Sequence, residues 1–298
     1  MPNTYPRIDF DENGTCNYCR NWKRISYKGD DSLRHAILSG GNYNIGTRGK
    51  YDCLLGVSGG RDSSYLLYYL TKILDLKVLA FSADHGLLPE QTKINIERMV
   101  DKLGVDLIIE RHNYLKNCFS SHVRAWIRRP DIGMAGVLCT GCRMGIDKLK
   151  FKVGKKFDIH VFVSGGTPFE GMGYKQDLIR SRPGGGQLSF ISGYMEKLAK
   201  NPYWVFNPYC LAAQVSEYYY HYFRKGRKFG LTFISPFWEY LHWNEKDILQ
   251  TITRELGWAK NPRLRSTWRG DCDVNSLKTY LYRNVLGFDD KDDNLSCL

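Results

Sequence analysis

Residues 58–63 read SGGRDS and have the composition of a phosphate-binding turn. Gly59 and Gly60 let the backbone approach a ligand closely, so that its N–H groups can point at an anion. Because a helical pattern follows directly, the positive end of the helix dipole would also favour negative charge at this point. The stretch therefore predicts an anion-binding site.

The elements on either side of this turn have the order that such a site requires. Residues 53–57 form a short apolar run of strand length, and a helical period begins at Ser64 and continues through Leu70. We therefore expect a strand, a glycine turn and the N-terminus of a helix in direct succession.

The motif is not one of the two most familiar nucleotide loops. The chain contains no Gly-Lys-Ser/Thr, which the P-loop GxxxxGK[ST] needs, and no GxGxxG. SGGRDS instead resembles the SGGxDS signature of the PP-loop ATP pyrophosphatases, which grip the β,γ-diphosphate and cut ATP between its α and β phosphates. The resemblance implies that the pyrophosphate is bound by Ser58, Gly59, Gly60, Asp62 and Ser63 and that Ser58 and Asp62 are also catalytic. The intervening Arg61 and the preceding Val57 are included in the expected ATP site.

Strand and helix patterns alternate beyond this motif. Further apolar strands are expected at 77–82, 106–110, 160–164 and 231–234, with helices at 89–103 and 146–157. Such βα repeats predict an α/β fold, a Rossmann-like parallel sheet with helices on both faces. Ligands bind at the carboxyl edge of such sheets, so the expected ATP site also includes residues that end two other strands: Ser82, Asp84, Ser164, Gly165, Gly166 and Thr167.

The C-terminal part has its own helix signals. Asn244 is a candidate N-cap with Asp247 at the third helical position, and Gly257 ends the predicted helix. A terminal helix is expected at 277–285. We divide the chain into an N-terminal arm with a C-x-x-C pair (1–48), an ATP-binding domain (49–240) and a C-terminal helical section (241–298).

Composition limits the cellular setting and the partners. The chain has 298 residues, of which 43% are hydrophobic. It shows no apolar run long enough to cross a membrane, and its N-terminus does not have the pattern of a signal peptide. We therefore expect a cytoplasmic protein without membrane contact. Lys and Arg number 43 against 31 Asp and Glu, a net charge of +12 that favours anionic partners.

Four of the nine cysteines form two C-x-x-C pairs, Cys16/Cys19 and Cys139/Cys142. In a reducing compartment such pairs favour metal or redox chemistry over structural disulfides. Cys16 and Cys19 make half of a zinc knuckle, and two incidental thiols in an arm are an equal alternative. Cys272 lies in a polar loop of the C-terminal section.

Several longer segments together resemble the N-acetyl sugar amidotransferases, PP-loop enzymes of bacterial surface-polysaccharide synthesis. The resemblance runs from about Arg7 to Phe288 and rests on RIDFDENGTCNYC, LCTGCRMGI, VFVSGGT, NEKDILQTITRELGW and GDCDVNSLKTYLYRNVLGF. It implies that ATP, with Mg²⁺, adenylates an N-acetyl oxygen and that ammonia from a separate glutaminase subunit then displaces AMP. Such proteins commonly carry another C-x-x-C before the equivalent of Cys16, and MPNTYPR stands there in this chain.

Sulfur-inserting PP-loop enzymes, among them a tRNA-thiolating group, are the alternative resemblance. Several of them hold a [4Fe-4S] cluster on a C-x-x-C and a later cysteine, a layout that Cys139, Cys142 and Cys272 match. Catalytic cysteines, or a Zn²⁺ site completed by Cys16 or Cys19, also fit these positions. The expected partners are ATP, an anionic small-molecule acceptor or tRNA, and a second copy of the chain in a homodimer.

Overall fold

The computed structural model describes residues 8–21, 25–40, 49–111, 113–131, 140–168, 195–196, 198–212, 215, 231–268, 270–281 and 283–284. Cys139 lies outside these residues, and the side chain of Cys142 is not among those described. Within the described part, no helix combines the length and the apolar character that crossing a membrane requires.

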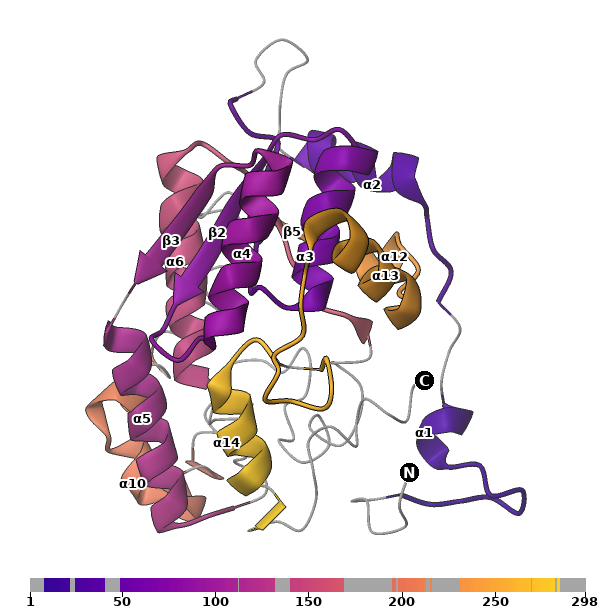
Figure 1. Ribbon diagram of the computed structural model, residues 1–298. Coiled ribbons are helices and arrows are strands. Elements are labelled where there is room, and N and C mark those ends of the chain that lie inside the picture. Colours follow the sequence, from indigo (N-terminus) through magenta and orange to yellow (C-terminus); the bar gives the residue numbers. More distant parts are fainter. Residues whose placement is uncertain are drawn as a thin grey trace.

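A five-stranded parallel sheet forms the centre of the molecule (Figure 1). The strands are β1 (Cys53–Gly56), β2 (Val78–Asp84), β3 (Leu107–Arg111), β4 (Val161–Val163) and β5 (Thr232–Ile234), in the order β3-β2-β1-β4-β5. The central strand β1 pairs with both neighbours, since Leu55 lies opposite Ala80 and Val163. The predicted α/β fold with a parallel sheet is confirmed, and every strand lies where its apolar run was expected.

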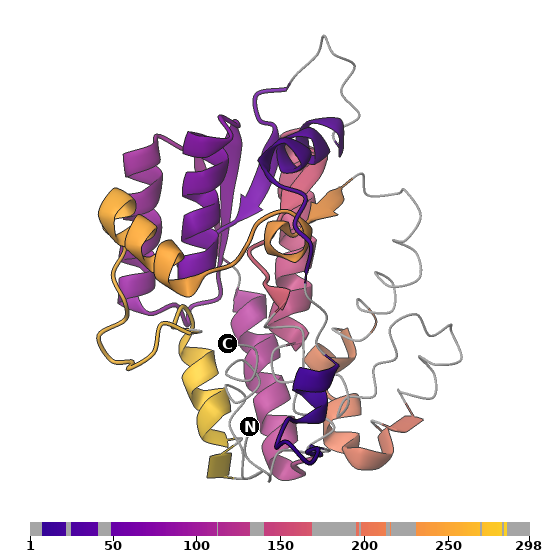
Figure 2. The same ribbon diagram turned by 90° about the vertical axis from the view of Figure 1, so that its right-hand side faces the viewer.

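One face of the sheet is covered by α2 (Asp30–Gly40), α3 (Arg61–Tyr68), α4 (Glu90–Leu103) and α13 (Glu245–Leu256). A π-helical turn, η1 (Tyr69–Ile73), continues α3. Because side chains alternate along a strand, Cys53 and Leu55 point into this layer while Leu54 points to the other. Figure 2 shows α3, α4 and α13 on one side of the sheet.

The opposite face is covered by α6 (Thr140–Lys156), whose Leu149 and Val153 pack with Leu54 and Phe162. A separate apolar cluster joins α5 (Asn113–Arg128) to α10 (Pro202–Val205) through the buried Trp126 and Trp204. These two helices lie below the carboxyl edge of the sheet in Figure 1.

The N-terminal region contributes more to the core than its sequence suggests. The short α1 (Asn17–Arg20) follows Cys16, but α2 carries the fully buried Leu33 and Ile37 into the layer that covers β1. This helix was not among the predicted elements, although Leu33, Ala36 and Ile37 have the spacing of one helical face.

The two predicted C-terminal helices are present, and one of them begins earlier than predicted. Asn244 caps α13 by accepting hydrogen bonds from the backbone N–H groups of Lys246 (3.0 Å) and Asp247 (3.2 Å), and Gly257 ends the helix with a φ of +67°. The short α12 (Pro236–Glu239) precedes it. The terminal helix, α14 (Asp273–Leu281), begins four residues earlier than predicted, and Asp273 N donates to Leu87 O at 3.1 Å.

Candidate functional site

The SGGRDS turn connects the end of β1 to the start of α3, as expected. Gly60 is the N-cap residue of α3. Because glycine has no side chain, it cannot cap the N–H groups of the first helical turn and does not compete with a ligand for them. The positive end of the helix dipole lies at the same place. The turn therefore has the geometry of an anion-binding helix terminus.

One glycine in this turn, Gly59, and one that packs against it, Gly165, cannot be replaced without displacing neighbouring atoms. Gly59 has a φ of +75°, and a Cβ there would lie 2.6 Å from the backbone oxygen of Thr92 on α4. A Cβ on Gly165, just after β4, would lie 3.2 Å from the backbone nitrogen of Ser63. Glycine is required at Gly59 both for its backbone conformation and for the close approach of α4.

The serine hydroxyls of the motif are organised around the turn. Ser63 Oγ accepts from Ser58 N at 3.2 Å and lies 3.2 Å from Ser58 Oγ, while Gly60 N donates to Ser58 Oγ at 3.3 Å. Ser58 is exposed, whereas Ser63 is buried. These contacts fix the turn and leave the Ser58 hydroxyl at the surface of the site.

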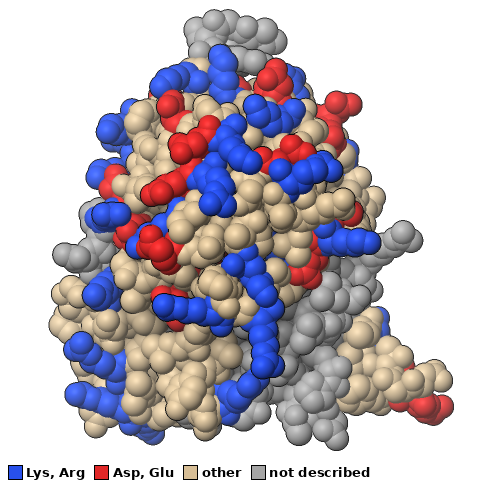
Figure 3. All heavy atoms as spheres, in the orientation of Figure 1, with Lys and Arg blue, Asp and Glu red and all other residues tan. Residues whose placement is uncertain are grey.

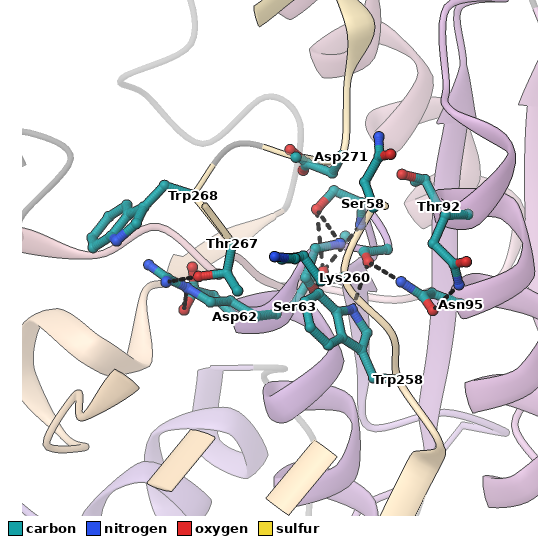
Figure 4. A pocket seen from close by; sticks show the side chains of 18 of the residues that line it. Ser58, Asp62, Ser63, Thr92, Asn95, Trp258, Lys260, Thr267, Trp268 and Asp271 are labelled. Carbon is teal, nitrogen blue, oxygen red and sulfur yellow. Dashed lines mark hydrogen bonds and ion pairs between the residues drawn. The ribbon is translucent and has the colours of Figure 1, made fainter. Parts of the chain in front are cut away.

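A cavity of about 300 Å³ opens directly over the turn. Figure 4 shows side chains from the turn, from α4 and from the segment after α13 around it. Of the predicted ATP-binding residues it is lined by Ser58, Gly59, Gly60, Arg61, Asp62, Ser63, Ser164, Gly165 and Gly166. The structure therefore brings the residues after β1 and β4 together at one edge of the sheet.

The carboxylate of Asp62 is oriented by a residue from the C-terminal section. Trp243 Nε1 donates a hydrogen bond to Asp62 Oδ1 at 2.8 Å. The side chain of Asp62 remains 17% exposed and faces the cavity. An oriented, partly exposed carboxylate beside a helix N-terminus can hold a divalent cation next to bound phosphates.

Residues 258–268 and 270–271 provide the opposite wall, and none of them was predicted as a site residue from the sequence. Trp258 Nε1 donates to Gly59 O at 3.0 Å. Asn95 on α4 donates to Ala259 O at 2.8 Å and accepts from Ala259 N at 3.1 Å. Because Asn95 is buried and also lies 3.4 Å from Gly59 O, α4, the glycine turn and the C-terminal wall meet at one point.

This wall adds two charged side chains to the cavity, Lys260 and Asp271, which lie beside Ser58 in Figure 4. Lys260 Nζ donates to Arg265 O at 3.2 Å. Asp271 Oδ2 lies 3.2 Å from where a Gly60 Cβ would be. An ammonium and a carboxylate at this position can act on phosphates and on a cation, respectively.

Some predicted site residues lie outside the cavity lining. Val57 and Ser82 are buried within the sheet layer. Asp84 pairs with Arg111 Nε at 2.9 Å and accepts from Gly86 N at 2.8 Å, so its carboxylate stabilises the turn after β2. Thr167 is buried, and its hydroxyl has no hydrogen-bond partner among the residues that the structure describes.

Cys272 follows the cavity residue Asp271 and lies close to a histidine. Its Sγ is 3.6 Å from His85 Nε2, and Leu87 N donates to His85 Nδ1 at 3.2 Å. Burial lowers the pKa of His85, although the carboxylates of Asp84, Asp271 and Asp273 act in the opposite direction. His85 is therefore biased toward the neutral imidazole.

The predicted metal sites are only partly described. Cys16 Sγ accepts from Cys19 N at 3.4 Å, the geometry of a helix N-cap. Over the described ranges, no group of three or more His, Cys, Asp or Glu side chains could hold a metal ion. The proposed set of Cys139, Cys142 and Cys272 lies partly outside those ranges.

Charge is unevenly distributed on the face shown in Figure 3. Asp and Glu gather mainly in its upper half, where Lys and Arg are interspersed with them, and Lys and Arg also extend over the lower half, where α5 lies. Exposed cations on α5 include Lys116, Arg124 and Arg128. An excess of positive charge below the carboxyl edge would attract anionic ligands toward the cavity.

The chain was compared with protein families and with solved structures. Residues 37–128 match the family model of the PP-loop domain. Among solved structures, the chain is similar to the U34-tRNA thiolase NcsA from Methanococcus maripaludis with its [4Fe-4S] cluster (13% identity, 89% of this chain and 77% of that chain covered, TM-score 0.41).

It is also similar to the NMN synthetase from Francisella tularensis (9% identity, 89% and 84% covered, TM-score 0.40). The NH3-dependent NAD synthetase from Campylobacter jejuni is a third similar structure (11% identity, 66% and 96% covered, TM-score 0.35). The matched residues 37–128 contain the SGGRDS turn, the strand before it and the helix after it. Residues 37–128 therefore form a PP-loop domain.

Proposed function

We propose that the protein is an ATP-dependent enzyme that adenylates an amide oxygen and replaces that oxygen with the nitrogen of ammonia, on an N-acetylated sugar acceptor. The observation that carries the ATP half of the proposal is the SGGRDS turn at the uncapped N-terminus of α3, open to a cavity of about 300 Å³. The acceptor half rests on the resemblance of the longer sequence segments to the N-acetyl sugar amidotransferases.

The proposed reaction balances without an external oxidant or reductant. The acetamido carbonyl oxygen attacks the α phosphorus of ATP, the bond between the α phosphorus and the bridging oxygen breaks, and pyrophosphate leaves. Ammonia then adds to the activated carbon, and AMP leaves with the former carbonyl oxygen. The products are an acetamidine, AMP and pyrophosphate.

The residues of the cavity fit this chemistry. The N–H groups at the start of α3 would bind the departing diphosphate, and Ser58 would donate to one of its oxygens. Asp62 would hold Mg²⁺, which supplies charge neutralisation when bound. Lys260 would bring a positive charge to the phosphates from the opposite wall.

The proposal that ammonia is the donor is tested by supplying different donors. The purified protein is incubated with ATP, Mg²⁺ and an N-acetylated nucleotide-sugar, with an ammonium salt, glutamine or sulfide as the only donor. We expect the acceptor to lose about one mass unit with ammonium, because oxygen is replaced by NH, and glutamine to be inactive until a glutaminase is added.

A second candidate is sulfur transfer, with a thiolated small molecule or tRNA as product. Its specific support is the contact between His85 and Cys272, the residue that follows the cavity residue Asp271. The Nδ1 of His85 accepts from Leu87 N, so a neutral His85 carries its proton on Nε2 and can donate to a Cys272 thiolate. If sulfide supports turnover with a mass gain of about 16 and ammonium is inert, sulfur transfer replaces the amidotransferase proposal.

A further inference from the structure

Arg61 occupies the variable position of the SGGxDS motif, and its guanidinium group lies in an unusual environment. The side chain is only 3% exposed. Its Cζ lies 3.9 Å from the ring centroid of Trp268 and 5.0 Å from that of Trp243, both of which are buried. The centroids of the two rings are 5.5 Å apart, so the guanidinium packs against both rings without being sandwiched between them. A cation next to two indole rings gains from the ring quadrupoles, more so because the site excludes water.

The same guanidinium is hydrogen-bonded to the C-terminal section. Arg61 Nη1 donates to Glu245 Oε1 and, at 2.8 Å, to Thr267 Oγ1. Thr267 Oγ1 in turn donates to Glu245 Oε1 at 2.7 Å. The three side chains form a closed set that joins the first residue of α3, the first residue of α13 and the wall segment.

The segment that forms the opposite wall of the cavity is held in position by side-chain contacts. Residues 258–268 and 270–271 contain neither helix nor strand, so no ladder of backbone hydrogen bonds fixes them. They are attached to the PP-loop side at one end through Trp258 and Asn95. Arg61 attaches the segment a second time, at Thr267, and Lys260 lies between these two attachments in the sequence.

We propose that Arg61 is a positioning residue that fastens segment 258–271 over the ATP-binding turn, so that Lys260 and Asp271 face the bound nucleotide. The proposal rests on the proposed use of ATP at this site. It assigns no phosphate contact to Arg61, because the guanidinium is already engaged by Glu245, Thr267 and the two indole rings and its Nε lies 3.5 Å from Asp62 Oδ1.

The geometry also explains why arginine is suited to this position. A guanidinium is planar, can stack on an aromatic ring and can donate at several fixed angles at once. A lysine ammonium could pair with Glu245 but could not stack in the same plane over Trp268. We therefore expect Arg61→Lys to restore only part of the function that Arg61→Met removes.

The test combines hydrogen exchange with nucleotide binding on the full chain. Backbone amide exchange of residues 258–271 is measured by mass spectrometry in the free protein, and the Kd of α,β-methylene-ATP with Mg²⁺ is measured by calorimetry. For Arg61→Met we expect exchange in this segment to accelerate by about tenfold or more and the Kd to rise by about tenfold.

Two further variants make the comparison interpretable. Arg254→Met removes a guanidinium from an exposed ion pair with Glu255 on the same helix as Glu245, and it should change neither readout. Thr267→Val removes one hydroxyl and keeps the shape of the side chain, so it should accelerate exchange in the segment even if Arg61→Met does not fold.

The outcomes separate this inference from the proposed function. If Arg61→Met weakens nucleotide binding without changing exchange in 258–271, Arg61 acts on the nucleotide directly or through Asp62, whose Oδ1 lies 3.5 Å from Arg61 Nε, and the inference is wrong. Unchanged values for both readouts would also overturn it. If the wild-type protein does not bind α,β-methylene-ATP, the proposed function fails, while exchange in the free protein still decides whether Arg61 fastens the segment.

Discussion

Trp243 Nε1 donates a hydrogen bond to Asp62 Oδ1 at 2.8 Å across a sequence separation of 181 residues. Asp62 belongs to the motif after β1, whereas Trp243 precedes α13 in the C-terminal section. The contact makes the C-terminal section part of the PP-loop site, because the carboxylate that would hold the cation is oriented from there.

The first prediction concerns this hydrogen bond. Trp243→Phe keeps an aromatic ring but removes the indole N–H, so the Asp62 carboxylate loses its orientation. We expect the Kd of α,β-methylene-ATP with Mg²⁺ to rise by about tenfold in calorimetry, with a smaller change when Mg²⁺ is absent.

Trp126→Phe is the matched control for that variant. Trp126 is fully buried and its Nε1 donates to Asp131 O at 3.2 Å, but it lies in the cluster of α5 and α10 and does not line the cavity. Equal weakening of nucleotide binding in both variants would mean that only general stability was lost.

The second prediction concerns the close approach at Gly59. Alanine there must adopt a φ of +75° and would place its Cβ 2.6 Å from Thr92 O, so either the turn or α4 must move. We expect Gly59→Ala to abolish nucleotide binding and to lower the free energy of unfolding by more than about 1 kcal/mol in urea titrations.

Gly104→Ala separates backbone strain from the collision. Gly104 has a similar φ of +65°, with no atom within 4 Å of a Cβ built there. It should lose about 1 kcal/mol of stability through backbone strain alone and bind nucleotide normally. Normal nucleotide binding by Gly59→Ala would contradict the described turn geometry.

The sequence was sufficient to predict the sheet and the first wall of the site. Buried parallel strands are short apolar runs, and the SGGRDS turn combines adjacent strand and helix signals within a few residues. Both signals are local. The two C-terminal helices were also found, since Asn244 and Gly257 mark the ends of α13.

The second wall could not be predicted because nothing local identifies it. Trp258, Lys260 and Asp271 lie in a segment without periodicity, and their proximity to Gly59 and Gly60 depends on how α13 packs against α3. Arg61 was included in the expected ATP site because of its place in the motif. Only tertiary structure shows its guanidinium with Glu245 and Thr267.

The third prediction concerns the cap of α13. Asn244→Ala removes the acceptor for two backbone N–H groups and should lower the free energy of unfolding by about 1 kcal/mol in urea titrations. Asn244→Asp keeps an acceptor oxygen and should retain most of the stability. A loss in the aspartate variant as large as that in the alanine variant would argue against the capping role.

The fourth prediction concerns thiol reactivity. Burial raises the pKa of Cys210 to about 12, and burial likewise raises the pKa of Cys53. Because only the thiolate reacts, both residues should resist iodoacetamide at pH 8 in the native protein, while the exposed Cys19 is alkylated faster than either of them.

The order of alkylation is read by peptide mass spectrometry. Reactivity of Cys53 and Cys210 should stay low as the pH rises toward 9, since this range lies below their raised pKa values, and should appear in urea when burial is lost. Alkylation of Cys53 at the rate of Cys19 in native buffer would contradict its buried position.

The most direct measurement of the central claim is the identity of the products formed from ATP. Phosphorus-31 NMR is recorded on reactions that contain the protein, ATP, Mg²⁺, an ammonium salt and an N-acetylated nucleotide-sugar, beside the Ser58→Ala and Asp62→Asn variants. The account predicts AMP and pyrophosphate in equal amounts, with most turnover lost in both variants. ADP and orthophosphate as the primary products would contradict it.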